Sequence, residues 1–493
     1  MKNYASLLLL AGVVGVLSIL FRLNRTADPL VAGLTSLLSP AASIVLPSSP
    51  LFANLTRRCV GAYNPEIAAV VRVGAEADVP LIISYAKQNG RTLFVGSSRH
   101  GWGASLNDVR DAIMVDITPL SAVVIDSAAN TVTVGGGVTI GRVVEALHAA
   151  GKETSAGGCD CVGFLGPTLG GGHGRLQGRY GLMADNLVSV RLATASSEIV
   201  TVSNTSHAEL FWGLRGAGHN FGIVTEAVYR IHDQPNGGID FSADITYEPE
   251  HLEDIFAALN AFSLEQPVDT TVFAMFVPRP GIQPFIALSF ISSSPATALE
   301  TLNRAFGHLP HTSRTESLIP ADHTNRLGAF GVGTVSCTNT VRKNAYGVSL
   351  THYHIPTVRG VFTLFAVFIA QNPEAHESVV VFESYPVQAV MAVPEADTAY
   401  PHREEKHLIL LLAVYPRAEL DGLVAQWLGS ASGILHTESG FEKPAVYLNY
   451  AHGGEGLGAS YGYEEWRMEK LKGLKRRWDP EGVFNAFHPI PSV

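Results

Sequence analysis

Glycine is concentrated in one stretch of the chain, and this stretch limits the folds that the chain can adopt. Residues 157–174 read GGCDCVGFLGPTLGGGHG, and a second glycine-rich stretch follows at 213–222. Glycine loses more conformational entropy on folding than any other residue, so a run this dense needs a structural reason. The usual reason is that backbone N–H groups closely approach a ligand's phosphate or ring oxygens. A flexible surface loop is the alternative, which the apolar, patterned flanking residues disfavour. We therefore expect a ligand cradle.

Charge and motif content exclude several other classes of protein. The 493 residues include 34 Lys and Arg against 44 Asp and Glu, a formal net charge of −10, and no basic run that would mark a nucleic-acid surface. The stretch at 157–174 is not a Rossmann fingerprint, because the acidic residue expected about 20 positions later is missing. A Walker A motif is absent as well. A phosphate cradle in this chain must belong to a different fold.

The amino terminus predicts entry into the secretory pathway. Residues 4–21 carry no charge, a length between that of a signal-peptide core and that of the shortest membrane span. We expect residues 1–25 to be either a signal peptide or a membrane anchor, so that the product is secreted or associated with a membrane. Three N-x-S/T triplets are then candidate glycosylation sites, and they begin at Asn24, Asn54 and Asn204.

Hydrophobic periodicity predicts a mixed α+β chain after a linker at 26–57. Up to the second glycine stretch, it predicts strands at 67–73, 91–96, 112–116 and 131–134, with helices at 75–89 and 139–150. Residues 239–440 read as a separate α+β unit. Its predicted strands are 271–277, 285–290, 363–369 and 408–414, its predicted helices include 250–263 and 418–428, and a charged helix follows at 464–478.

Five motifs, in order along the chain, resemble those of one flavoprotein family. They are FVGSSRHGW at 94–102, CDCVG with GGG between 159 and 172, FWGLRGAGHNFGIVT at 211–225, TAYPHR at 398–403, and YLNY with LKxxWDPxxVF between 447 and 484. Together they are similar to the berberine-bridge-enzyme-like branch of the vanillyl-alcohol-oxidase-like, PCMH-type FAD-binding flavoproteins. The resemblance covers roughly residues 58–490. Five ordered motifs are far more specific than any one alone.

The resemblance implies a bipartite architecture. A PCMH-type FAD-binding domain is expected at 58–235, and an α+β substrate-binding domain with an antiparallel sheet is expected at 236–440. A C-terminal segment, 441–493, is expected to return to the FAD domain. The cofactor-contacting positions that the motifs imply are Gly96, Ser97, Ser98, Arg99, His100, Gly101, Cys159, Val162, Gly163, Gly166, Gly170, Gly171, Gly172, Asn220, Gly222, Val224, Asn449 and Tyr450.

In this branch FAD is held by two covalent bonds, and the matching positions are His100, to the 8-methyl carbon, and Cys159, to C6. Cys161 is a nearby competitor for the second bond. Ser98 and Arg99 stand where the family usually has two glycines, so we expect the local turn to differ, and Arg99 has the charge to contact the pyrophosphate.

Three further positions bear on the reaction that the resemblance implies. Val162 matches the position that gates oxygen, and a small residue there favours O₂ as the electron acceptor. His173 and Tyr447 match active-site positions, and either is a candidate base; the alternative for each is a packed, hydrogen-bonded side chain. A buried Tyr447 needs nearby positive charge to form a phenolate, for which Arg403 and Lys443 are candidates.

An absent polar residue bears on the substrate. Leu411 matches a Glu or Gln of related enzymes, which predicts an apolar pocket wall and favours a small lipophilic metabolite over a sugar. We expect an FAD-dependent oxidase acting by alcohol oxidation, dehydrogenation or oxidative cyclisation, typical of secondary metabolism. A carbohydrate oxidase, or a cyclase or isomerase that uses FAD only structurally, remains the alternative.

Two other patterns are weaker. Gly458, Ser460 and Gly462 fit a G-x-S-x-G elbow, with Asp479 and His488 in hydrolase order, but no apolar strand precedes Gly458. A serine hydrolase is therefore a remote alternative. His352 and His354 lack a third ligand in their strand-like setting, and no metal site is predicted.

Overall fold

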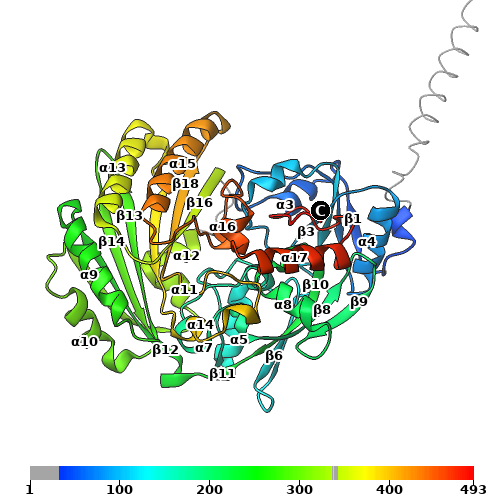
Figure 1. Ribbon diagram of the computed structural model, residues 1–493, viewed down its shortest axis with the longest axis horizontal. Coiled ribbons are helices and arrows are strands. Elements are labelled where there is room, and N and C mark those ends of the chain that lie inside the picture. The colour runs from blue at the N-terminus through cyan, green and yellow to red at the C-terminus, as the bar shows by residue number, and fades with distance from the viewer. Residues whose placement is uncertain (1–32, 336, 338–341, 493) are drawn as a thin grey trace, which may run out of the picture.

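The computed structural model describes residues 33–335, 337 and 342–492, and the chain folds into two lobes (Figure 1). The apolar stretch at 4–21 lies outside these residues. Within the described ranges, no helix combines the length and the hydropathy needed to cross a membrane.

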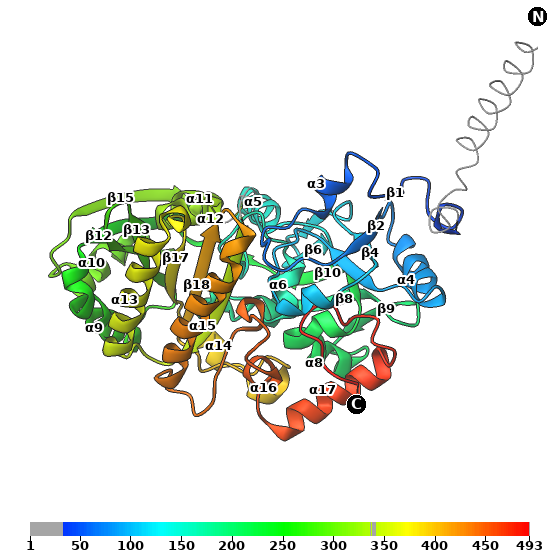
Figure 2. The same cartoon turned by 90° about the horizontal axis from the view of Figure 1, so that it is seen from above.

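One lobe is built on a seven-stranded, fully antiparallel sheet in the order β15-β12-β14-β13-β17-β18-β16. Helices cover one face of this sheet (Figures 1 and 2), and the apolar residues between the two layers form the largest core of the molecule. The strands are β12 (Ile239–Tyr247), β13 (Thr270–Arg279), β14 (Ile282–Ser292), β15 (Ser313–Pro320), β16 (Arg342–Leu350), β17 (Val379–Ser384) and β18 (His407–Tyr415). The covering helices are α9 (Leu252–Leu264), α10 (Pro295–Phe306), α13 (Ile355–Gln371) and α15 (Asp421–Thr437).

The strand predicted at 363–369 is wrong, because these residues lie inside helix α13. Seven nearly continuous apolar residues fit a buried strand and a buried helix equally well. Over the whole helix, however, the buried positions Val358, Val361, Phe362, Phe365 and Phe368 recur at helical spacing. The longer pattern decides the structure.

The other lobe contains two larger sheets and a two-stranded one, in which β7 (Lys152–Glu153) pairs with β11 (His232–Asp233). The first has the order β1-β2-β4-β3, with β2, β4 and β3 parallel, and the second is antiparallel in the order β5-β6-β10-β8-β9. Strand β1 comes from the stretch expected to be a linker, and it pairs with β2. The strands are β1 (Ser43–Val45), β2 (Ile67–Arg72), β3 (Leu93–Gly96), β4 (Ala112–Asp116), β5 (Val123–Asp126), β6 (Thr131–Gly135), β8 (Leu187–Ala193), β9 (Ile199–Ser203) and β10 (Ile223–Arg230). The helices of this lobe include α3 (Phe52–Thr56), α4 (Asp78–Gln88), α5 (Ile140–Ala149), α6 (Leu165–Leu169), α7 (Gln177–Tyr180) and α8 (Ala208–Ala217).

The C-terminal helix α17 (Glu465–Trp478) lies against this second lobe, beside α8 (Figures 1 and 2). Its apolar residues Leu471 and Leu474 pack in the same core as Phe211 and Leu214 of α8. The chain thus leaves this lobe at β12, forms the seven-stranded sheet and comes back. The α+β class and the antiparallel sheet are confirmed.

Candidate active site

The first predicted cofactor loop follows strand β3. Arg99 has φ +61°, a left-handed conformation that glycine adopts without strain and that costs other residues about 1–2 kcal/mol. The turn therefore keeps a glycine-like residue conformation with an arginine in it. The Arg99 guanidinium donates to the carbonyl oxygens of Arg57 and Ser97, so these backbone groups already take up part of its hydrogen-bonding capacity.

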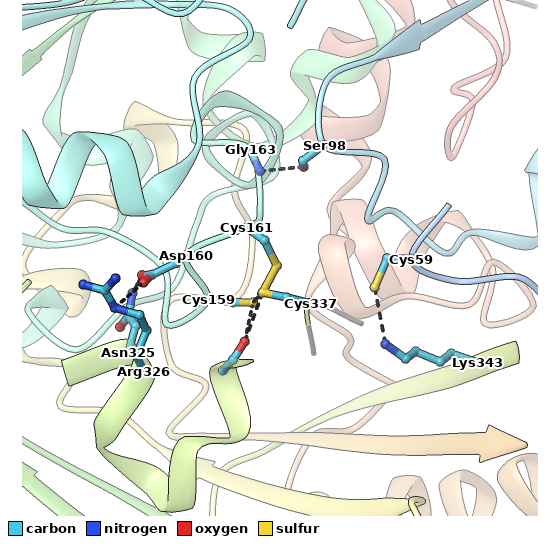
Figure 3. Close-up of a disulfide and its surroundings, with 11 residues drawn as sticks. Cys59, Ser98, Cys159, Asp160, Cys161, Gly163, Asn325, Arg326, Cys337 and Lys343 are labelled. Carbon is cyan, nitrogen blue, oxygen red and sulfur yellow. Dashed lines mark hydrogen bonds and ion pairs between the residues drawn. A yellow bond between two sulfur atoms is a disulfide. The ribbon is translucent and has the colours of Figure 1, made fainter. Parts of the chain in front are cut away.

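The second predicted loop, 157–163, lies directly against the first. The Gly163 N–H donates to Ser98 Oγ at 2.6 Å (Figure 3), and a Cβ on Gly163 would come within 3.0 Å of Ser97 Oγ. Burial, with the nearby charges of Lys343, Arg58 and Arg99, lowers the pKa of His100 to about 4, so its imidazole is neutral at neutral pH. Burial raises the pKa of the Cys159 thiol to about 11.

Cys161, the expected competitor of Cys159, is joined to Cys337 in a disulfide (Figure 3). Two of the three sulfurs at this point are thus already bonded, and Cys159 keeps its thiol. The nearby Cys59 sulfur lies 3.7 Å from Lys343 Nζ. Sequence spacing cannot reveal the disulfide, because its partners are 176 residues apart.

The triple glycine at 170–172 supports Tyr447. Asn449 Nδ2 donates to the Tyr447 hydroxyl oxygen at 2.7 Å and to the Pro167 carbonyl of α6 at 2.9 Å. The backbone N–H of His173 also donates to the Tyr447 oxygen. A Cβ on Gly170 would lie 2.7 Å from the Asn449 amide, so only glycine leaves room for this arrangement. Burial raises the pKa of Tyr447, and the two N–H donors oppose that rise.

The His173 side chain already has partners at both ring nitrogens. Nδ1 lies 2.9 Å from Gln177 Oε1, and Nε2 lies 2.7 Å from the Tyr400 hydroxyl and 3.0 Å from Glu405 Oε1. Ser349 Oγ donates to the other Glu405 oxygen. The His173 ring also packs edge-on against the Tyr447 ring, with the two ring centroids 4.6 Å apart. A side chain held in this way is suited to positioning its neighbours.

A carboxylate that the sequence analysis missed lies in the same cluster. Glu383 of strand β17 accepts a hydrogen bond from the Tyr450 hydroxyl at 3.0 Å, and its other oxygen, Oε2, is buried without a hydrogen-bond partner among the described residues. Burial raises the pKa of Glu383 to about 7, and hydrogen bonding from neighbouring tyrosines opposes the rise. The signal in the sequence is one acidic residue inside the apolar strand VVVFES.

Two expectations about the neighbourhood of Tyr447 and the sheet are wrong. Arg403 pairs with Asp185, and Lys443 lies over the ring of Tyr463, so the donors to the Tyr447 oxygen are N–H groups instead. Leu411 packs in the helix-covered core. Alternate strand residues face opposite sides, and on β18 it is Leu408 and Leu410 that pack on the other face of the sheet.

Three further predicted cofactor positions, Asn220, Gly222 and Val224, lie at the end of the second glycine stretch and in strand β10. His219 Nε2 lies 3.0 Å from the Gly166 carbonyl oxygen. The Asn220 side chain bonds Tyr461 and the backbone N–H of Ile490, which fixes the C-terminal tail. A Cβ on Gly222 would clash with Ala193 O, and the Val224 carbonyl closely faces Gly136, so both residues fit tight backbone packing around β10.

The hydrolase pattern is not assembled as a catalytic triad in the described residues. Asp479 accepts from Lys475 Nζ and from the N–H groups of Val483 and Phe484, while Ser460 lies in the short helix α16 (Leu457–Tyr461).

His352 and His354 follow β16 in a loop, so the strand-like setting expected for them is wrong. The one group of three candidate metal ligands in the described part of the chain is Cys159, Cys161 and Cys337, of which two are in the disulfide.

Comparison with known proteins decides what this site belongs to. A family model described as an FAD binding domain matches residues 67–203. The FAD-linked oxidoreductase anuG of Penicillium roqueforti is 33% identical over 461 residues, covering 92% of this chain and 90% of that protein. The FAD-linked oxidoreductase srdI of Neurospora crassa is 33% identical over 470 residues, covering 94% and 92%.

The chain belongs to the FAD-linked oxidoreductases.

Solved structures show the same fold at lower identity. BBE-like 1 of Physcomitrella patens superposes with a TM-score of 0.81 at 21% identity, covering 94% of this chain and 99% of that one. The 6-hydroxy-D-nicotine oxidase of Arthrobacter nicotinovorans gives 0.79 at 22% identity, covering 92% and 99%. The expected FAD-linked family is confirmed by the relatives, and the chain has the fold of the berberine-bridge-enzyme-like protein.

The residues at this site of the FAD-linked oxidoreductase fit FAD. Ser97 Oγ, Trp102 Nε1 and Arg58 Nε of the first loop region, and His219 Nδ1 of the second glycine stretch, are buried with no hydrogen-bond partner among the described residues. Such atoms are costly unless a ligand pairs with them. A Cβ on Gly158 or Gly166 would meet no atom within 4 Å, so the backbone is open to close approach there. A ligand with phosphates and a polar ring supplies the missing partners.

Proposed function

We propose that this FAD-linked oxidoreductase is an oxidase that takes a hydride from a small, lipophilic metabolite and passes the electrons to O₂. The observation that carries the proposal is the buried Glu383, with a pKa near 7 and one unpaired oxygen, beside Tyr447 and Tyr450. A base with a pKa near the working pH is the most effective kind. Its position on the sheet, beside the loops that fit FAD, suits proton removal coupled to hydride loss.

In this proposal each of the two lobes has its own function. Residues 58–235 with 441–493 form the FAD-binding domain, and residues 236–440 form the substrate-binding domain. FAD is held by the loops at 96–101 and 157–172, with covalent bonds from His100 and Cys159. The neutral imidazole of His100 supports this assignment, because a neutral ring nitrogen has a lone pair available for bonding to carbon.

When bound, FAD supplies the hydride acceptor and the route by which electrons leave to oxygen. The protein's own residues handle the proton. Glu383 Oε2 accepts the proton of a substrate O–H or N–H group. Tyr447 positions that group, because its own oxygen is held by Asn449 and by the His173 N–H. His173 is then a positioning residue, and Tyr447 acts with Glu383 as the catalytic pair.

The sheet face opposite the covering helices supports a lipophilic substrate. Val277, Phe285, Val379 and Leu410 are partly exposed there and pack around Met275 and Val381. Phe273 lies directly opposite Glu383 in the strand register. Apolar surface with one convergent polar group is typical of sites for small apolar ligands. We place the reaction in secondary metabolism on this ground and on the relationship to the fungal FAD-linked oxidoreductases.

A carbohydrate oxidase is the second candidate. The Tyr450 hydroxyl donates to Glu383, and Tyr385 and Tyr447 pack in the same cluster as Tyr450, so this region has hydroxyl groups of the kind that a sugar needs. The fold is also that of a xylooligosaccharide oxidase of Myceliophthora thermophila, with a TM-score of 0.77 at 19% identity. Turnover with a panel of lipophilic alcohols and of oligosaccharides distinguishes the two candidates.

We also propose passage through the secretory pathway. The Cys161–Cys337 disulfide supports it, since such bonds persist in oxidising compartments. Asn54 and Asn204 are exposed and accessible to glycosylation. Expression with and without residues 1–25, followed by deglycosylation and mass measurement of the secreted and membrane fractions, tests this location.

The experiment on FAD begins with acid precipitation of the wild-type protein and of the variants His100→Ala, Cys159→Ala and the double variant. Yellow colour should stay with the precipitate in the wild type and in each single variant and be lost only in the double variant. Loss of colour from the wild type would overturn both covalent bonds. Bleaching of the flavin by substrate under nitrogen, followed by H₂O₂ release on admitting air, supports the oxidase; turnover without bleaching would indicate a non-redox role.

A further inference from the structure

Three sulfur atoms meet at the second cofactor loop. Cys159 Sγ lies 3.6 Å from Cys161 Sγ and 3.7 Å from Cys337 Sγ (Figure 3). These distances are nearly equal, so the thiol lies beside the middle of the S–S bond. Thiol–disulfide exchange needs attack along the extension of that bond and a thiolate. The thiol occupies a different position, so the disulfide and the thiol persist side by side.

The disulfide removes one of two neighbouring nucleophiles. Cys159 and Cys161 are two residues apart on one loop, and each thiol alone has the chemistry to bond to a flavin ring. A sulfur in a disulfide has no thiolate form and is not a nucleophile. The bond to Cys337 therefore prevents Cys161 from reacting with the flavin. The Cys159 S–H is meanwhile directed to the Gly333 carbonyl oxygen at 3.3 Å.

The segment that leads to Cys337 is fastened to the same loop by other contacts as well. Cys337 follows closely after a capping segment, residues 324–335, which consists of α11 (Thr324–Leu327), a single turn and α12 (Val332–Val335). Asn325 Nδ2 donates to Asp160 Oδ1 at 2.8 Å, and Arg326 pairs with the same carboxylate at 3.4 Å (Figure 3). Neither contact involves a cysteine side chain. The effect of the disulfide on chemistry can thus be separated from simple detachment of the segment.

We propose that Cys337 determines which cysteine becomes linked to the flavin, by sequestering Cys161 in a disulfide and leaving Cys159 as the one thiol of the loop. The inference rests on the proposed function, which places FAD here. In the linking step Cys159 Sγ loses its proton and forms one S–C bond to the ring. The ring carbon loses its hydrogen as a proton, and the two electrons pass through the flavin to O₂, which takes up the two protons and becomes H₂O₂.

The test maps the flavin on peptides of the full-length protein under non-reducing conditions, with the soluble, folded fraction of each variant. In the wild type the flavin mass should appear on Cys159 and not on Cys161. In Cys159→Ser, with the disulfide intact, no sulfur-linked flavin is expected. In Cys159→Ser/Cys337→Ser, which frees Cys161, the link should reappear on Cys161, a gain that misfolding cannot produce.

Two further variants separate competition from positioning. Cys337→Ser should divide the flavin between Cys159 and Cys161, whereas Cys161→Ser/Cys337→Ser should restore the wild-type occupancy of Cys159. Flavin found only on Cys159 at wild-type occupancy in Cys337→Ser would overturn the inference, as would loss of the Cys159 link in the double variant. A wild-type protein without FAD would instead end the proposed function and the inference with it. A wild type whose flavin is mapped to Cys159, with no gain at Cys161, would end the inference alone.

Discussion

His173 Nε2 lies 3.0 Å from a carboxylate oxygen of Glu405, and both side chains are buried. The two residues are 232 positions apart, and they join the end of the glycine stretch at 157–174 to the loop that leads into β18. Ser349 and Tyr400 complete the hydrogen bonding around the pair. This contact fixes the backbone next to Tyr447, whose hydroxyl accepts from the His173 N–H.

Replacing His173 should destabilise the protein through its partner. His173→Leu leaves the Glu405 carboxylate buried with fewer hydrogen bonds, and a buried polar group that loses its partner costs about 1–3 kcal/mol. The double variant His173→Leu/Glu405→Leu should recover part of that loss, which chemical denaturation measures as a double-mutant cycle. Glu404→Gln, at an exposed neighbouring position, is the control and should change stability little. A double variant whose loss of unfolding free energy equals the sum of the losses in the two single variants would show that the pair is not coupled.

Activity should rise with pH as Glu383 loses its proton. Its pKa is about 7, and only the carboxylate accepts a proton, so the rate of flavin reduction under nitrogen should increase between about pH 6 and 8. Glu383→Gln should lower that rate about 100- to 10,000-fold and abolish the pH dependence. Glu377→Gln, on the exposed surface, is the control. A Glu383→Gln enzyme with the wild-type pH profile would exclude Glu383 as the base.

The same carboxylate should make the wild type less stable at high pH. The pKa of Glu383 is higher in the folded state than the ordinary 4.5, so the folded protein binds this proton more tightly than the unfolded chain. Relative to Glu383→Gln, the wild type should lose roughly 3 kcal/mol of unfolding free energy as the pH rises from about 4.5 through 7. Denaturation of both proteins at pH 5 and pH 8 measures the difference. A constant difference between them would contradict the raised pKa.

Adding one methyl group at Gly170 should impair catalysis through Asn449. Its Cβ would lie 2.7 Å from the Asn449 amide, which must move away from the Tyr447 oxygen. We expect Gly170→Ala to lower kcat by about tenfold or more, the equivalent of one hydrogen bond to a reacting group. Gly429→Ala in α15, where a Cβ meets no atom within 4 Å, should leave the activity unchanged. Steady-state kinetics with the identified substrate measures both variants. Equal kcat values for the two variants would show that Gly170 does not act on catalysis through Asn449.

Removing the disulfide should lower thermal stability. The Cys161–Cys337 bond spans 176 residues, and a cross-link over so long a loop restricts the unfolded chain, typically by about 2–5 kcal/mol. Cys161→Ser/Cys337→Ser should therefore melt several degrees below the wild type in non-reducing buffer. In strong reductant the two melting temperatures should converge. A wild-type melting temperature that does not respond to reductant would mean that the bond contributes little.

Much of this protein could be predicted from local patterns alone. Strands such as 112–116, and helices such as 139–150, form almost where hydrophobic periodicity places them, because secondary structure depends on near neighbours. The ligand cradle was also predicted from a local feature, the high density of glycine in the sequence. Glycine at positions such as 170 reflects contacts that leave no room for a side chain.

The chemistry of the site was decided by contacts between distant residues. Sequence alternation shows that Leu410 and Leu411 face opposite sides of β18, but which side the helices cover depends on how α13 and α15 pack. Glu383 has a pKa near 7 because the folded chain buries it, with Tyr450 of the C-terminal segment bonded to it. The sequence by itself therefore determined most of the helices and strands that periodicity predicts, and the position of the glycine-rich loops. The tertiary structure alone decided which acid is buried beside Tyr447 and which cysteine keeps its thiol, because both depend on what packs against each side chain.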